Sequence, residues 1–208
     1  MKSLLNSQVL DIATISGKLD FKNESIYTQW LAQTYYFVRH STRLLNLSAA
    51  LTPFELQFFH LRANEHAHEE KSHEKLLEMD LKQLGYSISS FDEFPVTQCL
   101  YQSQYYAIQH THPLSFLGYV ALLETLPLKI GKQLLTEIEP IYGHKASSFL
   151  RVHSQEDEDH MESLLKVFEQ LPSNILSTIQ NNLILSGYLY SNLIIEIGSK
   201  ANLKLQAG

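Results

Sequence analysis

The sequence predicts an all-α protein that folds as a single bundle of six or seven helices. It contains 8 glycines and 6 prolines among 208 residues, few helix breakers for a chain of this length. Apolar side chains recur at helical spacing in several long segments. Apolar residues make up 44% of the chain and charged residues 18%, which is typical of a protein with a packed core. We therefore expect residues 1–208 to form one domain, with a partly irregular N-terminal segment at residues 1–23.

The apolar periodicity and the helix-capping residues set the expected limits of each helix. Thr52, Pro53 and Glu55 are typical of a helix start, and Gly85 is typical of a helix end. The segment between them is long enough to predict a kink or a break, and Pro127 predicts a kink in a later helix. The expected helices cover residues 4–15, 25–46, 52–84, 96–109, 113–137, 140–170 and 172–199.

Charge and cysteine content exclude several classes of protein. The formal net charge is −6 at pH 7, whereas a nucleic-acid-binding protein needs a basic surface to meet phosphates. The single cysteine excludes a disulfide framework and a zinc site built from several cysteines. Residues 1–17 make a poor signal peptide, and residues 183–197 are too polar for a membrane span. We expect a cytoplasmic protein with a small-molecule substrate and with neither nucleic acid nor membrane as a partner.

Histidines and carboxylates concentrate in one stretch of the segment 52–84. His66, Glu70 and His73 are spaced i, i+4 and i+7, so that a helix brings them within about 60° of one another. On the same helix, Glu65 and His68 point elsewhere. A stripe of imidazoles and a carboxylate is a candidate metal-binding face.

A second stretch repeats this spacing with His153, Asp157 and His160. Apolar neighbours such as Phe149 and Leu164 indicate that the stripe faces the core. Unpaired charge is expensive to bury, so an inward-facing stripe of this kind needs a partner. Imidazole and carboxylate ligands together suit iron, manganese or zinc.

Glu124 is the third candidate, because it is the only acidic residue between Phe94 and Glu137. A lone carboxylate in so apolar a helix is paired, protonated or bound to a ligand. Two interpretations of the three features stay open on these residues alone. In one they form a metal site, and in the other they are polar core residues that satisfy one another, with an acidic solvent-facing run at residues 156–159.

With these features in this order, the chain over residues 24–200 resembles the haem-oxygenase-like superfamily. That superfamily includes the TenA/THI-4 proteins, the pyrroloquinoline-quinone synthases and the haem-oxygenase-like diiron oxidases, among them the chlamydial death-domain-associating protein. The diiron branch carries Glu-x6-His in one core helix, Glu in a second and His-x3-Asp-x2-His in a third. His153, Asp157 and His160 match the third motif, Glu124 matches the second, and His73 matches the end of the first.

The chain departs from the diiron pattern at His66, where the family has glutamate. Three outcomes follow from this departure: a dinuclear site with an extra histidine, a mononuclear site, or a site that binds no metal. The resemblance implies one or two iron ions as cofactor, with manganese or zinc as the other metals that such ligands suit. The metal ligands it implies are His73, Glu124, His153, Asp157 and His160, and His66, at the departing position, is the sixth candidate ligand.

The function implied by the resemblance is a non-haem iron oxidase or oxygenase that acts on a small organic substrate with dioxygen. Tyrosines on neighbouring helices are candidates for the pocket wall, namely Tyr35, Tyr36, Tyr101 and Tyr119. No catalytic residue is assigned, and analogy with similar bundles suggests a homodimer.

The alternative is a metal-free protein that keeps the fold, either as a small-molecule-binding protein or as a TenA-like enzyme. The surroundings of Cys99 do not resemble those of the TenA nucleophile, and we expect it to be a small buried residue. Geometry distinguishes the two functions. Metal ligands converge within about 2.0–2.3 Å of a common point, whereas hydrogen-bonded pairs lie about 2.7–3.2 Å apart.

Overall fold

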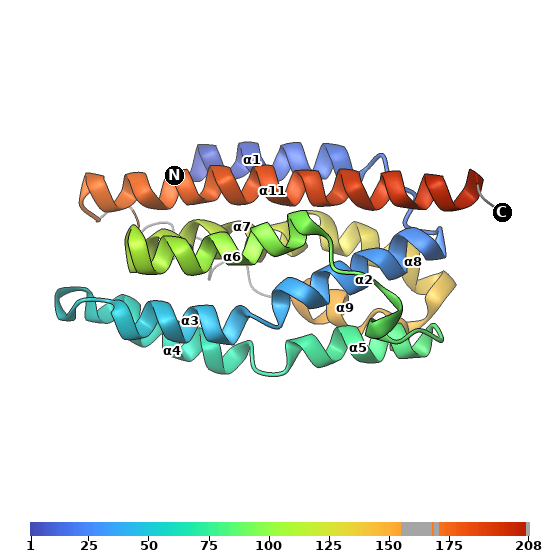
Figure 1. Cartoon of the computed structure of the whole chain (residues 1–208), viewed down its shortest axis with the longest axis horizontal. Coiled ribbons are helices and arrows are strands. Elements are labelled where there is room, and N and C mark those ends of the chain that lie inside the picture. The colour runs from blue at the N-terminus through green and yellow to red at the C-terminus, as the bar shows by residue number, and fades with distance from the viewer. Residues whose placement is uncertain (155–167, 169–170, 207–208) are drawn as a thin grey trace.

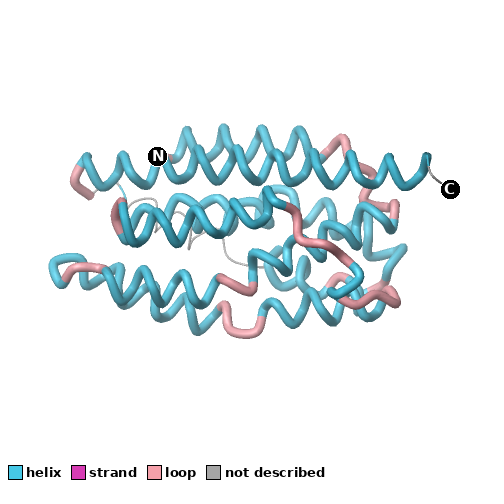
Figure 2. The backbone as a smooth tube through the Cα atoms, viewed as in Figure 1, coloured by secondary structure: helices cyan, strands magenta, loops and turns pink. Residues whose placement is uncertain are grey.

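The computed structural model describes residues 1–154, 168 and 171–206 (Figure 1). Within these ranges the regular secondary structure is helical and contains no strand (Figure 2). The predicted all-α bundle is therefore confirmed. The helices are α1 (Lys2–Ser16), α2 (Glu24–Val38), α3 (Ser41–Leu51), α4 (Gln57–Glu69), α5 (His73–Gln83), α6 (Pro95–His110), α7 (Leu117–Leu126), α8 (Lys132–Tyr142), α9 (Ser148–Ser154) and α11 (Ser173–Gln206).

The helices pack in layers around a continuous apolar core. Figure 1 shows α11 running along one side of the molecule beside α1, with α6 and α7 packed beneath it. Helices α3, α4 and α5 lie on the opposite side, where α3 pairs with α4, and α5 packs against both α2 and α9. Because α7 lies in the middle, most of its side chains are buried.

The stretch Pro113–Tyr142, which contains α7 and α8, is long and apolar enough by composition to cross a membrane. However, 72% of its most apolar window is buried against other parts of the protein. A core helix of a bundle has this same character, so the stretch gives only weak evidence for a membrane span.

Two of the predicted long helices are interrupted in the structure. The predicted helix over 25–46 breaks at residues 39–40, between α2 and α3. The predicted helix over 52–84 begins later than expected and breaks between Glu69 and His73. Thr52 does not cap it, because its hydroxyl donates to the Ser48 carbonyl at the end of α3, 2.7 Å away.

Prolines explain the remaining differences from the predicted limits. Pro127 begins a π-helical segment, Pro127–Gly131, where a kink was expected. Pro140 was expected to start a helix but lies inside α8, which continues to Tyr142 and ends at Gly143 with φ of 79°. Helix α9 therefore begins only at Ser148. At the N-terminus, α1 is regular over most of the segment that was expected to be partly irregular.

Candidate metal centre

The break between α4 and α5 shapes the first part of the site. Ser72 adopts a left-handed conformation with φ of 74°, and the His73 N–H donates to the Glu70 carbonyl, 3.3 Å away. The break leaves the Glu70 carboxylate between two imidazoles. Glu70 Oε1 lies 3.9 Å from His66 Nε2 and 3.4 Å from His73 Nδ1.

Glu70 is only 8% exposed, and it belongs to two clusters of candidate ligand atoms. One cluster contains Glu70, His73 and His153, and the other contains His66, Glu70 and Glu124. In each cluster the ligand atoms lie within 4.8 Å of one another. Because the buried carboxylate of Glu70 is common to both clusters, it could bind one metal ion or two.

Glu124 enters the site from α7, with Oε1 3.2 Å from His66 Nε2. The π-helical segment follows it three residues later and passes close to α9. A Cβ at Gly131 would lie 2.5 Å from the Ser154 hydroxyl, which would have to turn away, so this close approach favours glycine. The π-helical segment that follows Glu124 thus packs against α9, the helix that bears His153.

His153 is buried on α9 and is oriented by its own helix. Its Nδ1 donates to the Phe149 carbonyl, 2.8 Å away, so that in the neutral ring Nε2 carries the lone pair. Burial lowers the pKa of His153, which favours the neutral form that binds metals. The ring centroids of His73 and His153 are 4.8 Å apart, which brings α5 and α9 together at the site.

His66 has the opposite electrostatic environment. Burial alone would lower its pKa, but the hydrogen bond and negative charge of Glu124, together with the charge of Glu70, outweigh burial and raise it. The imidazolium of His66 is therefore stabilised by the two carboxylates. A bound metal ion would replace that proton.

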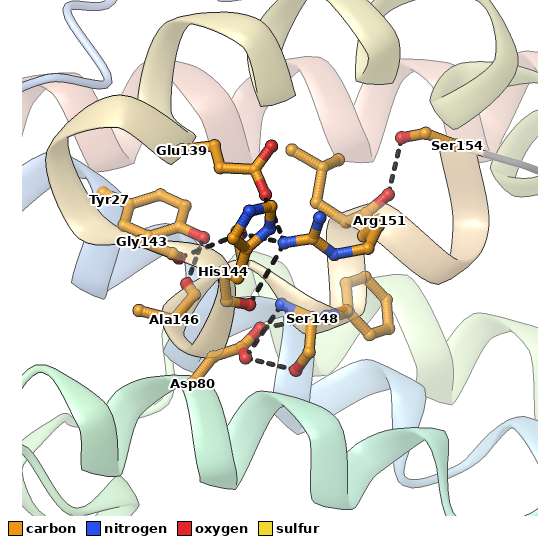
Figure 3. A network of polar contacts seen from close by, with 12 residues as sticks. Tyr27, Asp80, Glu139, Gly143, His144, Ala146, Ser148, Arg151 and Ser154 are labelled. Carbon is orange, nitrogen blue, oxygen red and sulfur yellow. Dashed lines mark hydrogen bonds and ion pairs between the residues drawn. The ribbon is translucent and has the colours of Figure 1, made fainter.

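A network of polar contacts holds the start of α9 in place (Figure 3). The buried carboxylate of Asp80 accepts hydrogen bonds from the Ser148 N–H and hydroxyl, and from the Phe149 N–H. Tyr27 donates to the Ala146 carbonyl, 2.7 Å away, just before α9. Arg151, one turn into α9, forms an ion pair with Glu139 of α8. These contacts fix the helix that carries His153.

The structure brings together four of the six side chains that the sequence singled out: His66, His73, Glu124 and His153. The other two, Asp157 and His160, lie outside the described residues. That these side chains bind a metal stays a prediction.

The prediction that Glu65 and His68 point away from the candidate site is confirmed, since both residues are exposed. Glu70 was placed on the stripe but was not chosen as a ligand. Its position between two histidines on that stripe was the signal that could have identified it.

A cavity of about 110 Å³ adjoins these side chains. His66, Glu70, Glu124 and His153 form its polar wall. The rest of the lining is mostly apolar and aromatic, and includes Trp30, Phe37, Phe116, Tyr119, Phe149 and Tyr190.

Of the tyrosines predicted to line the pocket, only Tyr119 does so among the described residues. Tyr36 instead donates to the Phe91 carbonyl, 2.6 Å away, and Tyr101 stacks on His40 with ring centroids 3.9 Å apart. Tyr35 packs edge-on against Tyr36. Tyr35 and Tyr36 on α2 and Tyr101 on α6 therefore do not line the cavity.

Cys99 is exposed on α6, so the expectation that it is buried was wrong. It does not contribute to the lining of the cavity. A nucleophilic role for Cys99 at this site therefore has no structural support.

The separations between ligand atoms are compatible with metal binding. For metal–ligand bonds of about 2.1 Å, adjacent ligand atoms lie about 3.0–3.4 Å apart in octahedral or tetrahedral geometry. The observed separations are 3.2 Å for His66–Glu124, 3.4 Å for His73–Glu70 and 3.9 Å for His66–Glu70. Two of the three fall in that range, and the separation of His66 and Glu70 is longer. The mixture of imidazole and carboxylate ligands suits non-haem iron.

Known structures share this architecture. A domain of unknown function with a haem oxygenase-like fold from Shewanella denitrificans superposes with a TM-score of 0.81 at 18% identity, covering 100% of this chain and 92% of its own. A TenA homologue from Pseudomonas syringae gives a TM-score of 0.73 at 12% identity, covering 94% of this chain and 92% of its own. A TenA homologue from Pyrococcus furiosus gives 0.66 at 14% identity, with coverage of 94% and 99%. At these identities the similarity establishes the haem-oxygenase-like fold.

The family is established by sequence. No curated protein matches the chain significantly. Residues 28–179 match the profile of a family described as iron-containing redox enzymes. That match spans most of the chain, including both histidine-rich stretches and Glu124, and the chain therefore belongs to this family of iron-containing redox enzymes with a haem-oxygenase-like fold.

Proposed function

We propose that the protein is a non-haem iron oxidase or oxygenase that uses dioxygen to oxidise a small organic substrate. The position of Glu70 carries this proposal, because its carboxylate faces His66 on one side and His73 on the other at the polar wall of an apolar cavity. Membership of the family of iron-containing redox enzymes supports the choice of metal.

Five described side chains would hold the iron: His66, Glu70, His73, Glu124 and His153. Asp157 and His160 are proposed as further ligands from the sequence motif alone. In this account Glu70 replaces the carboxylate that His66 displaces from the family pattern. Bound iron would supply the activation of dioxygen, which the side chains of this chain cannot provide.

The protein's own residues prepare the site for this chemistry. The Phe149 carbonyl fixes the His153 tautomer, so that its Nε2 is available without prior loss of a proton. Glu124 and Glu70 stabilise a proton on His66 until a metal displaces it. The aromatic walls of the cavity exclude water from a bound substrate and so limit side reactions.

One observation favours a second function, that of a metal-free binding protein. The 3.2 Å separation of His66 Nε2 and Glu124 Oε1 is also suitable for a hydrogen bond. In that case, His66 and Glu124 satisfy each other in the core and the cavity binds a ligand without redox chemistry. Metal loading distinguishes the two functions.

The test is dioxygen consumption by protein loaded anaerobically with Fe(II) and desalted. We expect iron to be retained and dioxygen to be consumed after mixing with aerobic buffer. His66→Ala should reduce both by at least about tenfold, because it removes one imidazole of the centre. His68→Ala is the matched control, since His68 lies on the same helix but is exposed. This variant should behave like the unmodified protein.

Zinc-loaded protein is the second control, because zinc has no redox chemistry and should not support dioxygen consumption. Two results would contradict the proposal. One is unmodified protein that retains no iron after desalting. The other is iron retention and dioxygen consumption that are equal in His66→Ala and His68→Ala.

A further inference from the structure

The cavity follows one face of a long helical stretch. The stretch Pro113–Tyr142, which contains α7 and α8, runs as one continuous helix. Cavity-lining residues recur along it at intervals of three or four residues, namely Phe116, Val120, Leu123, Pro127, Ile130 and Leu134. Residues at this spacing share one face of a helix. At about 1.5 Å per residue, the first and the last of them lie about 25 Å apart along the axis, so the cavity is elongated along this face.

A second wall comes from α2 and α3 and has the same spacing. Its lining residues are Trp30, Thr34, Val38, Ser41 and Leu45. The Ser48 hydroxyl, about one turn beyond Leu45, donates to the Pro113 carbonyl, 2.8 Å away. Because Pro113 lies about one turn before Phe116, Leu45 and Phe116 lie at the same end of the cavity.

The other end is formed by aromatic and aliphatic side chains. The Trp30 ring meets Phe149 and Phe21 edge-on, with ring centroids 6.4 Å and 6.2 Å apart. Leu150, the residue after Phe149, lies against Gly131, where a Cβ would be 3.4 Å from the Leu150 Cδ1. These residues all line the cavity, so the described lining at this end is apolar, as it is at the first end.

Polar side chains of the lining lie between the two ends. Glu124 is about midway between the first and the last lining residue of the long helical stretch, roughly 10–15 Å along the axis from each. Thr34 and Ser41 likewise fall within the lining range of the second wall. Ser16, at the end of α1, is a further small hydroxyl side chain of the lining. The candidate metal centre, which includes Glu124, therefore adjoins the middle of an elongated apolar cavity.

The volume of the cavity limits its width. It is about 110 Å³. A water molecule needs about 10–15 Å³ of such volume, so the cavity holds about seven to eleven groups of that size. A methylene group is about as large as a water molecule. Along so elongated a cavity, these groups form a row about one alkyl chain wide.

We propose that the cavity binds an unbranched, mostly apolar molecule of about seven to eleven heavy atoms, whose polar group is internal and lies against the candidate metal centre. An apolar arm of the ligand then extends toward each end of the cavity. The inference rests on the proposed function in one respect, because it names the substrate class of the same site. The binding itself involves only side chains of the protein and does not need the metal.

The first test compares two isomeric alcohols, 5-nonanol and 1-nonanol, on metal-free protein by calorimetry. In 5-nonanol the hydroxyl can reach the polar side chains while four carbons extend toward each end. In 1-nonanol either the hydroxyl lies in an apolar end or the whole alkyl chain must fit to one side. We expect 5-nonanol to bind about five- to tenfold more tightly, the effect of one hydrogen bond.

A third alcohol, 1-adamantanol, tests the shape of the cavity. It has a similar number of carbon atoms, but they form a rigid globular cage. We expect it to bind at least about tenfold more weakly than 5-nonanol, because a narrow cavity admits a cage only by displacing packed side chains.

A cavity-filling variant tests one arm. Leu134→Phe enlarges a partly buried lining residue near one end of the cavity. It should weaken the binding of 5-nonanol by at least about fivefold and leave that of 3-pentanol, whose arms are shorter, unchanged. Ile141→Phe is the matched control, because Ile141 lies on the same helix but is exposed and outside the lining. The two comparisons of alcohols use unmodified protein, so they test the proposal even if Leu134→Phe does not fold.

Three results would overturn the proposal: 1-nonanol binding as tight as 5-nonanol binding, 1-adamantanol binding as tight as 5-nonanol binding, and equal affinity of folded Leu134→Phe and Ile141→Phe for 5-nonanol. The iron experiment is separate from these measurements. If 5-nonanol binds as expected to a protein that retains no iron, the ligand class stands and the oxidase proposal fails. If iron is retained but the alcohols do not differ, the reverse holds.

Discussion

The carboxylate of Asp80, on α5, accepts hydrogen bonds from both the N–H and the hydroxyl of Ser148, the first residue of α9 (Figure 3). A second carboxylate oxygen accepts from the Phe149 N–H, 3.0 Å away. Helix α5 begins at His73 and α9 contains His153. One buried side chain therefore caps one ligand-bearing helix and ties it to another.

This relationship makes Asp80 a positioning residue. Asp80→Asn keeps the size of the side chain but replaces an accepting oxygen with a donor. We expect a loss of about 1–3 kcal/mol in the free energy of unfolding, together with weaker iron retention. Asp11→Asn, on the exposed face of α1, is the control. If Asp80→Asn is destabilised but binds Fe(II) with unchanged affinity, Asp80 supports the fold and does not position the site.

Two substitutions of Ser72 should have opposite effects on the free energy of unfolding. Its φ of 74° is unfavourable for a side chain with a Cβ, whereas the other described positive φ angles belong to Gly85 and Gly143. Ser72→Gly should raise the free energy of unfolding by about 1 kcal/mol and keep iron binding. Ser72→Val should lower both, because a β-branched residue resists this conformation. Thermal unfolding and iron content measure the two effects, and equal stability of the two variants would contradict the assigned strain.

Gly118 marks a close approach of α7 to α11. A Cβ at this position would overlap the Ile179 carbonyl and the Leu183 amide, which are backbone atoms and cannot move aside. Gly118→Ala should therefore lower the free energy of unfolding by about 2–4 kcal/mol. In Gly187→Ala the new methyl group meets only the end of the Gln8 side chain, which can move, so this control should lose less than about 1 kcal/mol. Urea unfolding of the two variants checks this, and similar losses would contradict it.

The lowered pKa of His40 predicts that the free energy of unfolding depends on pH. Burial, with the charges of Arg39 and Arg43, lowers the pKa of His40 to about 4. The unfolded chain, with a pKa near the usual value of about 6.5, then binds more protons than the folded protein between those pH values. The contribution of neutral His40 to the free energy of unfolding is therefore fully present above pH about 6.5 and is lost as the pH falls toward 4.

Because the His40 ring is partly exposed, this loss should amount to only about 1 kcal/mol. Urea unfolding at pH 7 and pH 4.5 measures it. His40→Gln should show a smaller loss than the unmodified protein between the two pH values. Identical losses would show that His40 does not titrate as described.

Local periodicity was enough to predict which side chains could gather at the site. His66 and His73 were placed on one helical face, and Glu124 was identified as an isolated carboxylate in an apolar helix. These inferences need only the angle per residue in a helix and the cost of burying a charge. They hold for His66 and Glu70, which lie one turn apart, whereas His73 lies beyond the break between α4 and α5, so its place at the site does not follow from a single helical face.

The parts that could not be predicted depend on contacts between distant segments. The role of Glu70 follows from a break at Ser72, and serine has no intrinsic preference for a left-handed conformation. Pro140 is tolerated inside α8, where a break was expected from its missing N–H. The cavity wall depends on how helices pack, so tyrosines on α2 that were expected to line it lie elsewhere.

The role of Glu70 is tested most directly by an anaerobic titration with Fe(II) that compares unmodified protein, Glu70→Ala and Glu69→Ala. Glu70 is shared by both ligand clusters, whereas Glu69 is exposed and pairs with Arg62. We predict that Glu70→Ala weakens the binding of all bound iron by at least about tenfold and that Glu69→Ala binds as tightly as the unmodified protein. Equal iron affinity and stoichiometry in the two variants would contradict the account.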